Sequence, residues 1–235
     1  MGPTLISRMH FMSDGSFRAA FLRELADAIP APARDANVLV GIDGVDGAGK
    51  TRLADELART MAPTQAVVRV SIDGYHHVRD RRYRRGRASP EGFWLDSYDY
   101  RVFRREVVDP FRAARGTYLP AVHDVETDRI LDAPRLPVPT GAVLLVDGIF
   151  LHRDELRDVW DESVFLDVPF DVSVPRMAGR DGLPDDPGAA ENTRYVEGQR
   201  LYLERCRPAE RASILVDYRD LTRPVVVTRR TKPGA

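Results

Sequence analysis

The fold is decided by the stretch Gly44-Val45-Asp46-Gly47-Ala48-Gly49-Lys50-Thr51, a phosphate-loop pattern with four residues between two glycines, then Lys and Thr. Residues 37–43 (NVLVGID), immediately before it, form a short apolar run that is typical of a buried parallel strand. Residues 52–61, immediately after it, carry apolar side chains at the spacing of an amphipathic helix. Strand, glycine-rich loop and helix in this order are the setting in which such a loop binds phosphate.

Glycines let the backbone N–H groups of the loop turn inward around a phosphate, and the helix N-terminus adds favourable partial charge. We expect the Lys50 ammonium to reach the β- and γ-phosphates of a nucleotide, and the Thr51 hydroxyl to complete the shell of a Mg²⁺ ion. The residues of the stretch expected to bind the nucleotide are Gly44, Asp46, Gly47, Ala48, Gly49, Lys50 and Thr51.

The composition sets bounds on the class of protein. A chain of 235 residues is long enough for one medium α/β domain with a proper core. The formal net charge of −1 argues against a general binder of nucleic acid or acidic membranes. The single cysteine, Cys206, excludes an internal disulfide and fits a reducing compartment. Because we find neither an 18-residue apolar run nor a signal peptide, we expect a cytoplasmic protein.

Two further apolar runs end in carboxylates. Residues 66–72 (AVVRVSI) are followed by Asp73, and residues 142–146 (AVLLV) are followed by Asp147. The carboxyl ends of parallel strands border the crevice in which open α/β sheets bind ligands. Asp73 is therefore expected to take the proton of an acceptor hydroxyl or to share the Mg²⁺ ion. Asp147 completes a Walker B form and is expected to hold the metal.

The second half of the chain contains a candidate lid. Residues 172–180 are predicted to form a helix that carries Arg176 and Arg180 on one face. The following residues 181–192 (DGLPDDPGAAEN) are rich in Gly, Pro and Asp and are interpreted as a mobile lid loop.

The segment between the second and third apolar runs is harder to interpret. Residues 79–87 (RDRRYRRGR) are the most basic stretch, and we interpret them as a solvated loop. Clamping of an anionic substrate and binding of single-stranded RNA are the alternatives. Residues 89–99 (SPEGFWLDSYD) are predicted as a loop whose carboxylates are available for hydroxyl recognition.

Together these patterns predict an α/β, P-loop NTPase fold, which resembles that of nucleoside and nucleotide kinases. We expect a five-stranded, mostly parallel sheet flanked by helices and completed by a lid. The whole chain, residues 1–235, is expected to form a single domain, with a loose N-terminal arm at 1–15 and a disordered tail at 229–235.

With these features assembled, residues 38–223 resemble the uridine kinase-like branch of P-loop kinases, which includes pantothenate kinases and phosphoribulokinases. The resemblance is carried by GVDGAGKT, SIDGYH, VDGIF and the RMAGRD that precedes the lid. It implies that Asp73 is the general base toward the acceptor hydroxyl and that Asp147 helps to bind Mg²⁺. It also implies that Arg176 and Arg180 contact the phosphates of ATP and act, with Lys50, in catalysis.

The resemblance also implies substrate-binding residues. Uridine kinases carry a Tyr followed five residues later by a His, both of which contact the base, and Tyr118 and His123 keep this spacing. The SPEGFWLDSYD segment is closer to pantothenate kinases, and there Asp99 is the acceptor-site carboxylate, with Asp96 as the fallback. Tyr75, in the Asp-Gly-Tyr segment, completes the candidate substrate set.

Several positions depart from the uridine kinase pattern. Asp147 stands where uridine kinases usually have Glu, and His123 lacks the Arg found two positions later. The phosphate loop also resembles that of thymidylate kinases, but Asp73 is followed by Gly-Tyr rather than Arg. The fold and the reaction class therefore transfer more directly than the acceptor does.

We therefore expect an ATP- and Mg²⁺-dependent kinase that phosphorylates a hydroxyl of a small metabolite, with uridine or cytidine as first choice. A pantothenate-like or sugar-phosphate acceptor is the alternative within the same family. The rival of another class is a regulator that binds a nucleotide, hydrolyses ATP slowly and signals by ordering of its loops. We expect no membrane partner and no nucleic-acid partner, and a homo-oligomer is compatible with the sequence.

Overall fold

The computed structural model describes residues 14–230 and places the strand that precedes the phosphate loop, β1 (Val38–Gly44), inside a sheet of six strands. The strand order is β10-β9-β8-β1-β7-β2, and every neighbouring pair is parallel except β9 and β10. The other strands of this sheet are β2 (Ala66–Ser71), β7 (Ala142–Asp147), β8 (Glu162–Asp167), β9 (Ile214–Asp217) and β10 (Val225–Arg229).

The sheet confirms the α/β class and the mostly parallel arrangement but corrects the number of strands from five to six. The edge strand β10 folds back and pairs antiparallel with β9, with Val225 opposite Asp217. Such a hairpin needs only a short connection, whereas another parallel strand would need a crossover of a dozen or more residues. The expected tail from residue 229 thus overlaps the end of this strand, and residues 231–235 lie outside the described residues, as do residues 1–13 of the expected arm.

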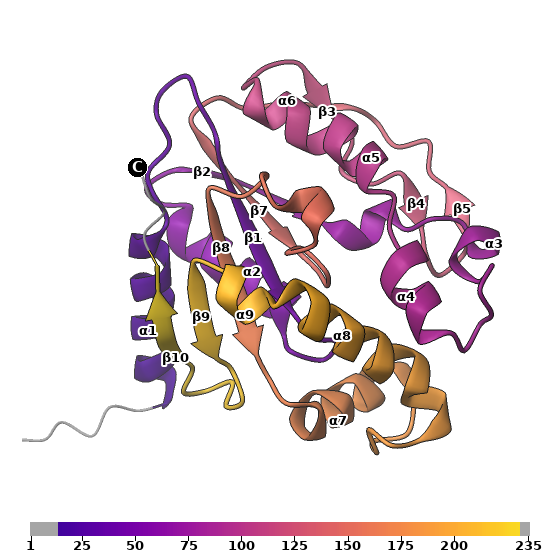
Figure 1. Cartoon of the computed structure of the whole chain (residues 1–235). Coiled ribbons are helices and arrows are strands. Elements are labelled where there is room, and N and C mark those ends of the chain that lie inside the picture. Colours follow the sequence, from indigo (N-terminus) through magenta and orange to yellow (C-terminus); the bar gives the residue numbers. More distant parts are fainter. Residues whose placement is uncertain (1–13, 231–235) are drawn as a thin grey trace, which may run out of the picture.

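Helices cover both faces of the sheet (Figure 1). One face packs on α1 and α2, and the opposite face packs on the helices between β2 and β3 and on α8. The longer helices are α1 (Asp14–Ala28), α2 (Lys50–Met61), α4 (Pro90–Asp96), α7 (Phe170–Asp181) and α8 (Thr193–Cys206). The shorter ones are α3 (Arg79–Arg82), α5 (Tyr100–Phe103), α6 (Asp109–Arg112) and α9 (Pro208–Arg211).

The apolar runs alternate between these two layers, as the period of two in a strand requires. On β1, Leu39 faces the α8 side, whereas Val40 and Ile42 face the α2 side. On β7, Leu144 and Val146 face the α8 side, and their neighbours on the strand face α2. Because both faces are buried, β1 and β7 are continuous apolar runs rather than alternating apolar and polar residues.

Register brings the carboxyl ends of three strands to one edge. Ser71 of β2 pairs with Asp147 of β7, and Asp147 pairs with Ile42 of β1. The phosphate loop therefore begins beside Asp147, and Asp73 follows in a single 3₁₀ turn, Ile72–Tyr75. The phosphate loop, Asp73 and Asp147 thus share one edge of the sheet.

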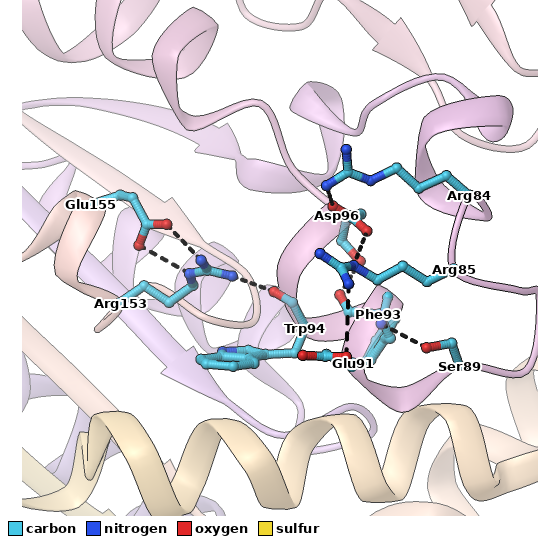
Figure 2. Close-up of polar contacts among 11 residues, drawn as sticks. Arg84, Arg85, Ser89, Glu91, Phe93, Trp94, Asp96, Arg153 and Glu155 are labelled. Carbon is cyan, nitrogen blue, oxygen red and sulfur yellow. Dashed lines mark hydrogen bonds and ion pairs between the residues drawn. The ribbon is translucent and has the colours of Figure 1, made fainter.

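The sequence predicts a loop at residues 89–99, and this prediction is wrong. Residues 90–96 form helix α4 (Figure 2). The Ser89 hydroxyl accepts a hydrogen bond from the N–H of Gly92 at 3.0 Å, and Pro90 occupies the first turn. A Ser N-cap followed by Pro is a helix-start signal that the Gly and Pro content of the segment concealed. At the end of the helix, the Asp96 carboxylate accepts from Arg84 at 2.6 Å and from Arg85 at 3.0 Å.

Residues 104–136 complete the chain between α5 and β7. A π-helical turn, Arg104–Val108, joins α5 to α6, and the following strands are the short β3 (Thr117–Tyr118), β4 (His123–Asp124), β5 (Arg129–Ile130) and β6 (Leu136–Pro137). Two short 3₁₀ turns, Asp154–Leu156 and Ala190–Asn192, lie elsewhere in the chain. Within the described residues, no helix is both long and apolar enough to cross a membrane.

The crossing of α4 and α8 gives a test of the packing. A methyl group added at Gly198 would lie 2.8 Å from the carbonyl oxygen of Pro90 and 2.9 Å from the Phe93 ring. Ala stabilises a helix interior by about 1 kcal/mol relative to Gly, but overpacking against backbone costs about 1–3 kcal/mol. We therefore expect Gly198→Ala to lower the midpoint of thermal unfolding.

Gly179 in α7 is the matched control, since a methyl group there meets nothing within 4 Å. Gly179→Ala should leave the midpoint unchanged or raise it. An equal rise in both variants, measured by calorimetry, would show that α4 and α8 can separate without cost and would contradict this packing.

Candidate active site

The phosphate loop has the backbone that phosphate binding needs. Gly47 and Gly49 have φ angles of 73° and 95°, in the left-handed region that favours glycine. Gly49 is the N-cap residue of α2, so the helix starts at Lys50 and its first N–H groups face the loop. A methyl group at Gly47 would lie 2.0 Å from the carbonyl oxygen of Ser173 in α7, which packs directly on the loop. The glycines therefore serve both the turn and the close approach of α7.

The Lys50 side chain folds back over this loop. It is 9 % exposed, and its ammonium donates a hydrogen bond to the carbonyl oxygen of Val45 at 2.8 Å. The ammonium needs to break only this one hydrogen bond to move to a ligand. A compact, charged ammonium is then suited to bind a phosphate oxygen. Two other residues of the loop were expected to bind the nucleotide. The Gly44 N–H donates to the Asp43 carboxylate, and Ala48 is fully buried.

One carboxylate links the candidate metal residues. The Thr51 hydroxyl donates to Asp147 Oδ2 at 2.6 Å, and Arg69 of β2 donates to Asp147 Oδ1 at 2.6 Å. Asp147 itself is 1 % exposed at the end of β7. One hydroxyl and one carboxylate beside a phosphate site are the protein ligands that Mg²⁺ usually takes, the rest being water and phosphate oxygens. The residues present therefore fit a Mg²⁺ ion, and Arg69 is a neighbour that the sequence did not reveal.

The Asp73 carboxylate is exposed but oriented by an aromatic neighbour. The Tyr98 hydroxyl donates to Asp73 Oδ1 at 2.7 Å. Burial, reinforced by the nearby Asp73 carboxylate, raises the pKa of Tyr98 well above its usual value, so the phenol stays a donor. His76 Nδ1–H donates to the Asp73 carbonyl oxygen at 2.8 Å, and the imidazole lies against the Tyr98 ring. Burial lowers the pKa of His76.

Two cavities border this edge of the sheet. The first, called here the phosphate-loop cavity, has a volume of about 300 Å³ and is lined by Gly47, Gly49, Lys50, Thr51, Arg176 and Arg180 among others. The second, called here the Asp73 cavity, has a volume of about 360 Å³ and is lined by Asp46, Asp73, His76, Tyr98, Arg180 and Arg194 among others. Arg180 lines both cavities, so this residue lies where they adjoin.

The two lid arginines differ in their surroundings. Arg176 donates to the carbonyl oxygens of Tyr218 and Arg219, which fixes it over the loop after β9. Arg180, one turn later on α7, contributes to both cavities. In the predicted lid, the Asn192 side chain donates to the carbonyl oxygens of Pro184 and Asp186, each at 2.8 Å. The segment thus has an internal tether, and its movement as a lid stays a prediction.

Four candidate substrate residues lie away from the Asp73 cavity. Tyr75 and Tyr118 are buried in the core, where Tyr75 donates to the Leu119 carbonyl oxygen and Tyr118 packs against Phe111. His123 is 4 % exposed and its Nε2 contacts Asp128 at 3.1 Å.

The fourth of these residues is Asp99, which caps α5 by accepting from the N–H of Val102 at 3.1 Å. It borders a different cavity, of about 510 Å³. Asp96, its fallback, is held by two arginines. Contact of any of these residues with a substrate stays a prediction.

Two other contacts were missing from the sequence analysis. The Gln199 side chain on α8 accepts from the Asp46 N–H at 2.7 Å and donates to Asp46 Oδ2 at 3.1 Å, so it fixes the middle of the phosphate loop. Arg194, also on α8, lines the Asp73 cavity. Both lie about 150 residues after the loop, so no local sequence pattern predicts that they approach it.

The basic run at 79–87 is largely engaged within the protein. Arg82 contacts Asp128 at 3.3 Å, and Arg84 and Arg85 both contact Asp96. Arg82 and Arg87 also lie over the Tyr83 ring. Arg84 and Arg85 hold the segment against α4. Most of its residues are nevertheless exposed, as expected of a solvated segment, although residues 79–82 form the short helix α3.

Comparison with known proteins supports what the geometry indicates. The uridine kinase of Shewanella frigidimarina is 27 % identical over 149 residues, which are 61 % of this chain and 68 % of that protein. The uridine kinase of Shewanella pealeana is 28 % identical over 182 residues, 73 % of this chain and 79 % of that protein. A scan against protein-family models finds no match.

Among solved structures, a possible uridine kinase from Bacillus stearothermophilus superposes with a TM-score of 0.65 at 24 % identity, covering 84 % of this chain and 96 % of that one. The fold, the phosphate loop and these relatives define a P-loop kinase, a phosphotransferase whose acceptor is a hydroxyl group. Within that class, the sequence relatives are uridine kinases at 27–28 % identity, and these likenesses support a uridine kinase-like kinase.

Tyr98 offers a test of how Asp73 is positioned. Tyr98→Phe removes the hydroxyl that donates to Asp73, and we expect acceptor-stimulated kcat to fall by about 3- to 30-fold. The loss should stay below that of a buried charged hydrogen bond because Asp73 is exposed.

Tyr100→Phe is the matched control, since the buried Tyr100 hydroxyl has no hydrogen-bond partner among the described residues. We expect kcat to be retained in this variant. Equal losses in steady-state assays of the two variants would point to disturbed packing and would contradict an orienting role for Tyr98.

Proposed function

We propose that this chain transfers the γ-phosphoryl group of ATP to a hydroxyl of a small metabolite bound in the Asp73 cavity. The observation that carries the proposal is the shared edge at which the phosphate loop, the Thr51–Asp147 pair and Asp73 meet. A donor site and an acceptor site that adjoin at Arg180 are what direct transfer between two bound molecules requires.

In this proposal the residues divide the work. The amides from Gly47 to Lys50 and the Lys50 ammonium hold the phosphates, and Arg176 and Arg180 neutralise charge that develops on the transferred group. Thr51 and Asp147 would hold a Mg²⁺ ion, which would neutralise further phosphate charge when bound. Asp73 orients the acceptor hydroxyl and takes its proton as the new bond to phosphorus forms.

Two acceptor classes are compatible with this reaction. A pyrimidine nucleoside agrees with the names of the relatives, and the Asp73 cavity has the rings of Tyr83, Phe93 and Tyr195 on which a base can stack. A pantothenate-like or sugar-phosphate acceptor agrees with the arginines that line the same cavity. ADP release from Mg²⁺-ATP with uridine, cytidine, other nucleosides, pantothenate and sugar phosphates separates the two.

The general base gives the most direct test of the reaction. Because Asp73→Asn keeps the shape of the side chain but cannot accept the proton, we expect kcat to fall by about 10²- to 10⁴-fold. The dissociation constant for ATP should stay within about threefold, since Asp73 lines the other cavity.

Asp80→Asn is the control, because Asp80 is an exposed carboxylate seven residues away that lines neither cavity. Turnover and ATP affinity are measured for both variants and for the unaltered chain. Full turnover in Asp73→Asn would rule out Asp73 as the base.

A further inference from the structure

A buried arginine without a carboxylate partner lines the Asp73 cavity. Arg194, the second residue of α8, is 7 % exposed. One of its terminal nitrogens donates to the carbonyl oxygens of Arg87 at 3.0 Å and Ser89 at 3.4 Å. Among the side chains that the structure describes, no carboxylate forms an ion pair with this guanidinium.

The positive charges of two neighbouring arginines are balanced by carboxylates, whereas that of Arg194 is not. Arg82, which lines the same cavity, contacts Asp128 at 3.3 Å, and Arg84 contacts Asp96 at 2.6 Å. Arg194 is instead held between two aromatic rings, with its guanidinium carbon 4.9 Å from the centre of Tyr83 and 5.3 Å from that of Phe93. Ring faces and carbonyl oxygens stabilise a cation but do not neutralise it.

This arrangement is electrostatically unfavourable without a counter-charge. Burial lowers the pKa of Arg194, and the neighbouring Arg82 and Arg87 lower it further. A buried cation is normally paired, because leaving it unpaired costs more than a buried neutral group. The guanidinium is planar and held by rings, so it can present its other nitrogens to an anion with two parallel hydrogen bonds.

The carboxylates that line the cavity are already engaged. Asp46 is held by Gln199, and Asp73 accepts from Tyr98. The cavity therefore combines a carboxylate suited to a hydroxyl with a buried, unneutralised guanidinium, in a volume of about 360 Å³. A single small molecule can contact both.

We propose that the phosphoryl acceptor carries an anionic group, a carboxylate or a phosphate, in addition to its reacting hydroxyl, and that Arg194 binds this group. The inference rests on the proposed function, since it names the acceptor class of the same site. It makes Arg194 the residue that selects for charge, while Asp73 acts on the hydroxyl.

The first experiment compares acceptors that differ only in charge. Pantothenate is paired with its alcohol panthenol, ribose 5-phosphate is paired with ribose, and uridine and cytidine are included as neutral nucleosides. ADP release is measured for the unaltered chain, for Arg194→Met and for Arg200→Met. Arg200 is the control because it lies on the same helix, is exposed and pairs with Glu197.

We expect the charged member of one pair to stimulate ADP release and its neutral twin to be much weaker. Which pair responds tells a carboxylate from a phosphate. Arg194→Met should raise the KM for that acceptor by about 10- to 100-fold while changing kcat and the KM for ATP little. Arg200→Met should match the unaltered chain. Equal use of charged and neutral twins, or nucleosides alone as acceptors, would overturn the inference.

The second experiment does not depend on the right acceptor. With the nucleotide site saturated by Mg²⁺ and a non-hydrolysable ATP analogue, inorganic phosphate and acetate are titrated in by calorimetry. We expect millimolar binding of at least one anion to the unaltered chain and to Arg200→Met, and its loss in Arg194→Met. Unchanged binding in Arg194→Met, or none in the unaltered chain, would contradict the inference.

A purely structural role for Arg194 is tested in the same series. Arg194→Lys keeps the charge and should retain part of the anion binding, and the unfolding midpoint of each variant reports on packing. The outcomes also separate the two proposals. Nucleoside turnover that requires Asp73 would uphold the proposed function and reject the anionic acceptor. Anion binding through Arg194 without any acceptor-dependent transfer would uphold the anion site and reject the reaction.

Discussion

The hydrogen bond between Thr51 and Asp147 is the contact on which the site depends. It joins the first turn of α2 to the end of β7, and through Arg69 the same carboxylate reaches β2. Asp147 can do this only because β7 lies between β1 and β2 in parallel register. A carboxylate that is 1 % exposed and held by a hydroxyl and a guanidinium fixes the relative positions of three elements before any ligand arrives.

From this fixed edge, two cavities extend in different directions and share Arg180. In the phosphate-loop cavity, backbone N–H groups of the loop and of the helix N-terminus would bind phosphate. This mode of binding is the same wherever such a loop occurs. The Asp73 side is built from side chains that come from α4, α7, α8 and the segment after β2. Reaction class and acceptor choice therefore reside in different parts of the molecule, which explains why the relatives identify the first more firmly than the second.

How far the sequence predicts the structure depends on the distance over which each signal acts. The phosphate loop, the apolar strands and the strand-end carboxylates Asp73 and Asp147 are local patterns, and each lies where its pattern indicates. The α4 helix was missed because Gly and Pro outweighed the Ser89 cap, and the number of strands was predicted as five rather than six. Contacts such as Tyr98 with Asp73 and Gln199 with Asp46 join distant segments, so no local pattern predicts them.

The central claim is direct transfer of phosphoryl from nucleotide to metabolite, and the fate of a labelled γ-phosphate tests it most directly. ATP labelled at the γ-phosphate is incubated with Mg²⁺, the purified chain and a mixture of hydroxyl-bearing metabolites, and the labelled products are separated. The account predicts that the label appears in an organic phosphomonoester, in amounts that depend on the metabolites. Label found in inorganic phosphate alone, at a rate the metabolites do not change, would contradict it and would favour a nucleotide-binding regulator with slow ATP hydrolysis.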